Sequence, residues 1–169
     1  TWYAPVLCHT MEEVWQKFKT ENIESEHLKI FKNPDNIWDN VTLLEKWENI
    51  KKIRKTINTA IEIARNEKKL GSSLEANVVL ITKDKSILEL IKSIEMHNVC
   101  IISSFVILDN KDIIENNFIS TFSNKEKNVE VFVYNTKYEK CLRCWQYKKE
   151  VSANKGLCER CLLVINKNK

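Results

Sequence analysis

Glycine and proline are scarce in this chain, with only two of each among its 169 residues. A glycine-rich loop that cradles phosphate groups needs several glycines close together, so this class of nucleotide site is excluded. No apolar run reaches about 18 residues, so the sequence offers no membrane-spanning helix. The chain begins TWYAP, without a methionine or a basic-then-apolar leader. We therefore expect a segment of a longer protein, without an export signal.

Basic charge is concentrated at one end of the chain. Residues 137–169 hold nine Lys or Arg against three Asp or Glu, a balance of +6, whereas residues 1–136 have a balance of −2. Such asymmetry favours a polyanionic partner for the tail. A lysine-rich end that is merely solvated is the alternative that charge alone leaves open.

The segment 1–71 has a helical pattern. TMEE at 10–13 matches a capping box, which predicts a helix start at Thr10. NPD at 33–35 is a second helix-start signal, and apolar residues then recur at steps of three and four from Trp38 to Ala64. This pattern predicts one amphipathic helix over 37–69, ended by Gly71 and about 50 Å long.

The hydrophobic period changes after Gly71. We expect a strand over 74–82, a helix over 87–96, a strand over 99–108 and a strand over 129–134, with 109–128 as a loop. That order implies a small α/β layer packed with the long helix. The fold class is therefore α+β, in three segments: a helical part at 1–71, the α/β layer at 72–136 and a terminal module at 137–169.

Four cysteines in the terminal module have the spacing of metal ligands. Cys141 and Cys144 form one CxxC pair, and Cys158 and Cys161 form a second pair after the intervening segment 145–157. Each CxxC turn directs two sulfurs toward one point, and two turns complete the tetrahedron that Zn²⁺ prefers. With all four positions filled by protein, the expected site is structural, one zinc per chain. An iron–sulfur cluster and a redox-active CxxC pair are the alternatives.

Basic and aromatic side chains surround these cysteines. Basic groups contact phosphates and aromatic rings stack on unpaired bases, so the expected nucleic-acid contacts are drawn from this set: Arg143, Trp145, Tyr147, Lys148, Lys149 and Arg160. The alternative for Trp145 and Tyr147 is that they pack the small core of the module. Gly156 is expected to serve a turn between the two CxxC pairs.

The remaining reactive residues suggest no chemistry. Cys8 and Cys100 stand alone and are expected to be packed thiols. No plausible nucleophile–base pair is visible, so we predict no catalytic residue in this chain. Six cysteines without a leader favour a reducing, cytoplasmic or organellar, compartment.

Three segments together resemble the C-terminal region of bacterial-type isoleucyl-tRNA synthetases. KCLRCWQY at 140–147, closed by LCERC at 157–161, resembles the zinc motif of that family. ARNEKKLGSSLEA at 64–76 looks like its junction between the anticodon-domain helix and an α/β segment, and YAPVL at 3–7 with TMEEVW at 10–15 looks like the preceding helical element. Residues 84–136 match only in pattern.

The resemblance implies a tRNA-binding region of a class I synthetase that uses ATP and magnesium to attach isoleucine to its tRNA. The family's catalytic elements, His-Ile-Gly-His and Lys-Met-Ser-Lys-Ser, and its editing domain are absent from this segment, which should therefore be inactive alone. Cys141, Cys144, Cys158 and Cys161 match the family's zinc ligands. We expect a monomer that binds isoleucine tRNA on the anticodon side and has no membrane partner.

Two other interpretations remain open. The chain could be a standalone zinc-ribbon protein that binds nucleic acid. It could also be the equivalent region of a valyl- or leucyl-type synthetase, which would share the helical part.

Overall fold

The structure, a computed structural model, describes residues 1–111 and 114–167 and forms two compact units. The first unit is Thr1–Val41 and the second is Thr42–Lys169. The division into segments 1–71, 72–136 and 137–169 stays a prediction. Among the described residues, no helix is long and apolar enough to cross a membrane.

The first unit contains the helix α1, Cys8–Phe18, and two short 3-10 turns, Glu26–Leu28 and Asn36–Trp38. The predicted capping box is wrong, because α1 begins two residues before Thr10 and has no side-chain cap. The carboxylate of Glu12, which the capping box did not involve, accepts hydrogen bonds from the Ser25 hydroxyl at 2.8 Å and the Glu26 amide at 3.0 Å, and this ties the helix to the following turn. Cys8 is exposed, so its prediction as a packed thiol is also wrong.

The long helix α2 extends over Val41–Asn66 and is shorter than predicted. At 1.5 Å per residue, its 26 residues span about 39 Å. The start signal at 33–35 is real but serves another element, because Asp35 caps the 3-10 turn by accepting a hydrogen bond from the Ile37 amide. The helix ends before Lys68, whose backbone is left-handed with φ 57°, so Gly71 is not the terminator.

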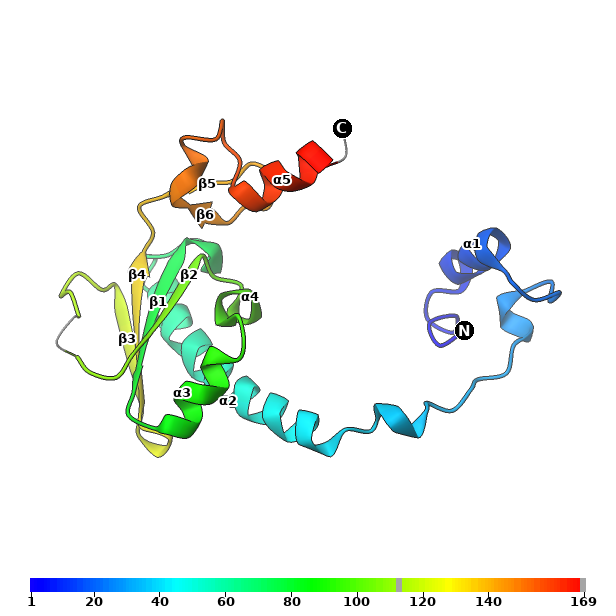
Figure 1. Ribbon diagram of the computed structural model, residues 1–169, viewed down its shortest axis with the longest axis horizontal. Helices are drawn as coiled ribbons and strands as arrows, with labels where there is room; N and C mark the ends of the chain where they lie inside the picture. The colour runs from blue at the N-terminus through cyan, green and yellow to red at the C-terminus, as the bar shows by residue number, and fades with distance from the viewer. Residues whose placement is uncertain (112–113, 168–169) are drawn as a thin grey trace. The chain divides into compact units, whose positions relative to one another are not determined.

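The second unit is built on a four-stranded sheet with the order β2-β1-β4-β3 (Figure 1). Its strands are β1, Ala76–Thr82; β2, Ser104–Leu108; β3, Ser120–Asn124; and β4, Val129–Asn135. The pair β1–β2 is parallel, whereas β4 is antiparallel to both β1 and β3. The predicted strands at 74–82 and 129–134 are confirmed with small shifts of their ends.

The other predictions for this segment need correction. The region 87–96 contains two helices, α3 at Lys85–Lys92 and the beginning of α4 at Met96–Cys100. Asp84 fixes the start of α3 by accepting hydrogen bonds from two backbone amides. The predicted strand at 99–108 begins only at Ser104, so Cys100 lies at the end of a helix, where it is buried as a packed thiol. The expected loop at 109–128 contains the edge strand β3, and its residues 112–113 lie outside the described residues.

Alternation along β1 and β4 gives the sheet one apolar face. Side chains of α2, α3 and α4 pack against this face and form one buried core, which includes Ile57, Ile61, Val78, Leu80, Ile91, Met96, Val131 and Val133. The opposite face carries the outward residues of the same strands, among them Asn77, Val79 and Tyr134. The expected packing of an α/β layer on the long helix is therefore confirmed.

The terminal module follows β4 directly. It contains a two-stranded hairpin, β5 at Glu139–Lys140 and β6 at Tyr147–Lys148, then a 3-10 turn at Lys149–Val151 and the helix α5 at Glu159–Lys167 (Figure 1). The loop of the hairpin carries the first CxxC pair, and the start of α5 carries the second. Short elements of this kind need another source of stability than their own apolar contacts.

Candidate metal centre and nucleic-acid surface

The hairpin loop 141–146 shapes the first pair of sulfurs. The Cys141 amide donates to the Gln146 carbonyl and the Trp145 amide donates to the Cys141 carbonyl, both at 2.9 Å. Trp145 adopts a left-handed backbone, with φ 64°, which closes the turn. These bonds hold Cys141 and Cys144 on the same side of the loop.

The second pair of cysteines is placed by the beginning of α5. Cys158 immediately precedes the helix, where its carbonyl accepts from the Leu162 amide at 3.0 Å, and Cys161 lies in the first turn. The N-terminal end of a helix carries partial positive charge, which stabilises thiolates. The sequence therefore uses a helix start for the second pair and a hairpin loop for the first.

A glycine-dependent contact joins the two cysteine segments. The Leu142 amide donates to the Gly156 carbonyl at 2.9 Å, and Gly156 has φ +82°, a conformation that side chains rarely adopt. A Cβ at this position would stand 2.8 Å from Cδ1 of Leu142. The turn predicted at Gly156 is therefore confirmed, and both its backbone angle and its lack of a side chain are required.

The four sulfurs converge on one point. All lie within 4.8 Å of one another, and Sγ of Cys144 is 3.6 Å from Sγ of Cys158. A tetrahedral ion with bonds of about 2.3 Å to sulfur needs its ligands about 3.8 Å apart, so this spacing fits zinc. None of the four cysteines is in a disulfide, and Cys141, Cys158 and Cys161 are buried.

The surroundings of the cluster favour charged sulfurs at some positions and oppose them at others. Burial acts to raise the pKa of the Cys141 thiol, but backbone N–H groups of residues 144, 158 and 143 outweigh it and lower this pKa to about 6. Burial raises the pKa of Cys158 to about 12, and neighbouring cysteines reinforce the shift. Four thiolates this close repel one another, and a divalent cation at their centre removes that conflict.

The predicted phosphate-binding side chains divide into two groups. Arg143 and Arg160 face the sulfurs: Nη1 of Arg143 lies 3.9 Å from Sγ of Cys161, and a hydrogen bond to Cys144 raises the pKa of Arg160. Both are exposed, so they offset the negative charge of the cluster at its surface. Lys149 is also exposed, and it belongs to the 3-10 turn that follows the hairpin.

Lys148 and Tyr147 connect the module to the sheet. Nζ of Lys148 donates to the Ser103 carbonyl at 3.1 Å, and the Tyr147 amide donates to the Ser103 hydroxyl at 2.8 Å. Ser103 is 1% exposed, and its hydroxyl also bonds to the Leu74 carbonyl. The structure therefore gives both residues a docking contact, and it brings in Ser103, which the sequence pattern did not single out.

Trp145 lies outside the core of the module. Its side chain is 59% exposed, and the described core consists of Val151, Leu157 and the cysteines. Nζ of Lys140 stands 5.1 Å from the centre of the Trp145 ring, a cation–π contact. Sequence reasoning missed Lys140, although its pairing with Tyr147 across a short hairpin would place it beside the loop that carries Trp145.

Two family models match the chain. The anticodon-binding domain of tRNA ligase matches residues 1–80, and the zinc finger found in FPG and IleRS matches residues 139–164. The second match covers all four cysteines of the cluster. Together with the geometry, it identifies a site for one structural zinc ion.

Curated relatives resemble nearly the whole chain. The isoleucine–tRNA ligases of Zymomonas mobilis, Caldanaerobacter subterraneus and Oceanobacillus iheyensis are 34%, 35% and 35% identical to it, over 96%, 94% and 98% of its length. The chain spans only 15% of the first relative and 17% of the other two. The chain therefore belongs to the isoleucine–tRNA ligase family and corresponds to its C-terminal region.

Proposed function

We propose that this chain is the tRNA-binding C-terminal part of an isoleucine–tRNA ligase, working in the cytoplasm as a monomer. In the whole protein, other domains would use ATP and magnesium to attach isoleucine to its tRNA, and this chain would supply affinity on the anticodon side. It would carry out no chemistry by itself. The match of residues 1–80 to an anticodon-binding domain supports this assignment most directly.

The zinc module is proposed to contact the RNA backbone through its exposed cations. With four thiolates and one divalent ion, the balance of +6 in residues 137–169 becomes +4, so the module remains basic. Lys149 and Lys140 are exposed, and Arg143 and Arg160 line the surface above the sulfurs. A rigid metal site would hold these groups at fixed separations, which favours contacts with successive phosphates.

Trp145 is proposed to stack on an unpaired base. Its ring is exposed, and Nζ of Lys140 lies beside it, so a base and its phosphate could be bound by neighbouring groups. Tyr147 and Lys148 would act mainly by fixing the module on the sheet through Ser103.

Binding of isoleucine tRNA at several salt concentrations tests the electrostatic part. Lys149→Ala should weaken binding and reduce the slope of log affinity against log salt by about one unit, because one phosphate contact is lost. The matched control is Lys92→Ala, which removes an exposed lysine from α3. If the affinity for tRNA does not change with salt concentration, or if the two variants weaken binding equally, the module does not bind the RNA backbone through Lys149.

Trp145→Ala tests the stacking part. It should weaken binding about tenfold while the zinc content stays at one per chain, because the ring is outside the core. Loss of zinc together with affinity would instead assign the ring a structural role. A valine tRNA measured in parallel tests specificity, and equal affinity for both tRNAs would contradict a specific isoleucine partner.

A further inference from the structure

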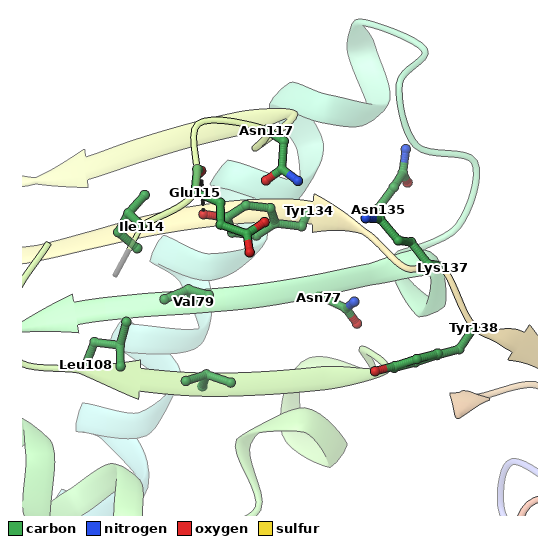
Figure 2. A pocket seen from close by; sticks show the side chains of 11 residues that line it. Asn77, Val79, Leu108, Ile114, Glu115, Asn117, Tyr134, Asn135, Lys137 and Tyr138 are labelled. Atoms are coloured by element: carbon green, nitrogen blue, oxygen red, sulfur yellow. Dashed lines mark hydrogen bonds between the residues drawn. The ribbon is translucent and has the colours of Figure 1, made fainter. Parts of the chain in front are cut away.

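A cavity lies on the face of the sheet that the helices leave uncovered. It has a volume of about 450 Å³, and residues of β1, β2, β4 and the segment 114–117 line it. Figure 2 shows these side chains in front of the strands, with the helix behind the sheet. Pockets for small organic groups have volumes of about 300–1,000 Å³, so a planar ring would fit here.

The floor of the cavity is flat and apolar. It consists of outward-facing side chains of neighbouring parallel strands, Val79 on β1 with Val106 and Leu108 on β2. Val106 is 45% exposed, although valine in a strand usually contacts another layer. A ring lying flat against these side chains would remove apolar surface from water.

Asn77 offers an unsatisfied polar group at the edge of that floor. Its Oδ1 is buried and has no hydrogen-bond partner among the described residues. A buried acceptor without a partner destabilises the structure, so a ligand with an N–H donor would find a favourable partner here. A side-chain amide also presents a donor beside its acceptor, the pattern with which asparagine recognises the edge of a base.

The walls of the cavity have a ring on one side and a fixed loop on the other. Tyr138 is 46% exposed and lies in the connection between β4 and the zinc module, next to Lys137. Opposite it, the Tyr134 hydroxyl donates to the Glu115 carbonyl at 3.1 Å and holds the segment 114–117 against the strand (Figure 2). The charges of Lys137 and Glu115 balance, so the lining suits a neutral heterocycle better than a phosphate.

We propose that this cavity binds one unpaired nucleobase of the RNA whose backbone the zinc module contacts. Asn77 hydrogen-bonds the edge of the base, the ring of Tyr138 packs against the base from the side, and Val79 and Val106 form the surface beneath. This inference rests on the proposed function, because the base belongs to the same RNA. It adds a second recognition site on the sheet, joined to the module by residues 137–138.

The test compares two RNA probes with the zinc-loaded chain. One is a hairpin with a seven-nucleotide unpaired loop, and the other is a fully paired duplex of equal length. Asn77→Val should weaken hairpin binding about tenfold and leave duplex binding and the salt slope unchanged, because only a base-edge contact is lost. Its thermal midpoint should not fall, since an unsatisfied buried acceptor is removed. Tyr138→Ala should weaken hairpin binding similarly, and Tyr138→Phe should restore it.

The matched control is Ser123→Val on β3, at the opposite end of the sheet. It should bind both probes like the parent. Parental hairpin affinity in both Asn77→Val and Tyr138→Ala, or equal losses on hairpin and duplex, would overturn the proposal for the cavity. If the parent binds the hairpin and Lys149→Ala weakens it while the cavity variants do not, only the cavity proposal fails. A parent chain that binds neither probe would contradict the proposed function itself.

Discussion

The zinc module and the four-stranded sheet adjoin in the chain but are stabilised by different interactions. The sheet buries an apolar core with three helices, including Val78, Leu80, Val131 and Ile57, each fully buried. Among the described residues 137–167, the buried side chains are Val151 and three cysteines. A module with so little apolar core depends on its metal, whereas the sheet does not.

Removal of the metal should give the largest difference between the zinc module and the sheet, measured as protection of their amides from hydrogen exchange. Chelation should unfold residues after about 137 and leave the sheet intact, because none of the four sulfurs belongs to the sheet's core. Hydrogen exchange of the chelated chain measures this: amides of the module should lose protection while those of β1 and β4 keep it.

Metal analysis of two cysteine variants sharpens that result. Cys158→Ser should abolish the single zinc, since three thiolates remain, while Cys8→Ser should retain it, because Cys8 is exposed and far along the chain from the cluster. An unchanged zinc content in Cys158→Ser would remove this residue from the site. Loss of protection in β4 on chelation would show that the two regions fold as one.

The next largest effect should come from a substitution in the core of the sheet, where it should lower the free energy of unfolding. Leu80→Ala removes a fully buried side chain and should lower the free energy of unfolding by about 2–5 kcal/mol. Val106→Ala, on the exposed face of β2, should cost less than about 1 kcal/mol. Denaturant unfolding measures both, and zinc content should stay at one per chain. Equal costs would contradict the assignment of the two faces.

The thiol of Cys100 provides a probe of the sheet's core at alkaline pH. Burial raises its pKa to about 11, above its usual value near 9. The native state therefore favours the neutral thiol. The stability that Cys100 contributes to folding is fully present below about pH 9 and is lost as the pH rises toward 11. The loss should amount to about 2–3 kcal/mol. Unfolding measured at pH 8 and pH 10.5 tests it, with Cys100→Ala as control. The same alkaline slope in both proteins would assign the effect to other groups.

The metal site was predictable because its signal is local and discrete. Two CxxC pairs specify ligand type, number and spacing within the short segment 141–161, and the structure brings all four sulfurs together. The strands β1 and β4 were also predictable, because valine alternates with other residues along β4, and β1 is a short run rich in β-branched residues. In both cases one physical requirement determines the residue type at each position.

Other elements could not be predicted because their stability comes from distant residues. The strand β3 reads STFSN and has a weak pattern, but pairing with β4 supplies its backbone hydrogen bonds. The Ser120 hydroxyl donates to the Ala60 carbonyl at 2.7 Å, and the Asn124 amide donates to the Thr56 hydroxyl at 3.1 Å. Both partners lie on α2, far from β3 in the sequence, so no local window contains this information.

The sequence also led to wrong predictions of helix starts, because a capping signal can belong to an element other than the predicted helix. The cap at Asp35 starts a 3-10 turn instead of the long helix, and the capping box expected from Thr10 and Glu13 does not form, because α1 begins at Cys8. Ser103 had no signal at all, because its role depends on the module folding back onto β2. The candidate site could therefore be predicted as a metal centre, but not as a module docked on a sheet.

The smallest effect should come from breaking the contact between the zinc module and the sheet. This experiment shows whether the two regions are stable independently of each other. Ser103→Ala removes both the acceptor of the Tyr147 amide and the donor to the Leu74 carbonyl, so we expect a loss of about 1–2 kcal/mol in the free energy of unfolding. Zinc content should stay at one, because Ser103 is not one of the four clustered cysteines, and the bond from Lys148 should persist, because its acceptor is the backbone carbonyl. Hydrogen exchange should show faster exchange of the Tyr147 amide, while amides near the cysteines stay protected. Ser93→Ala is the matched control, because its exposed hydroxyl donates to the nearby Leu90 carbonyl at the end of α3. A Tyr147 amide as protected as in the parent would show that the module is held by other contacts. A loss of zinc in Ser103→Ala would show that docking on the sheet stabilises the metal site, and that the two regions are coupled.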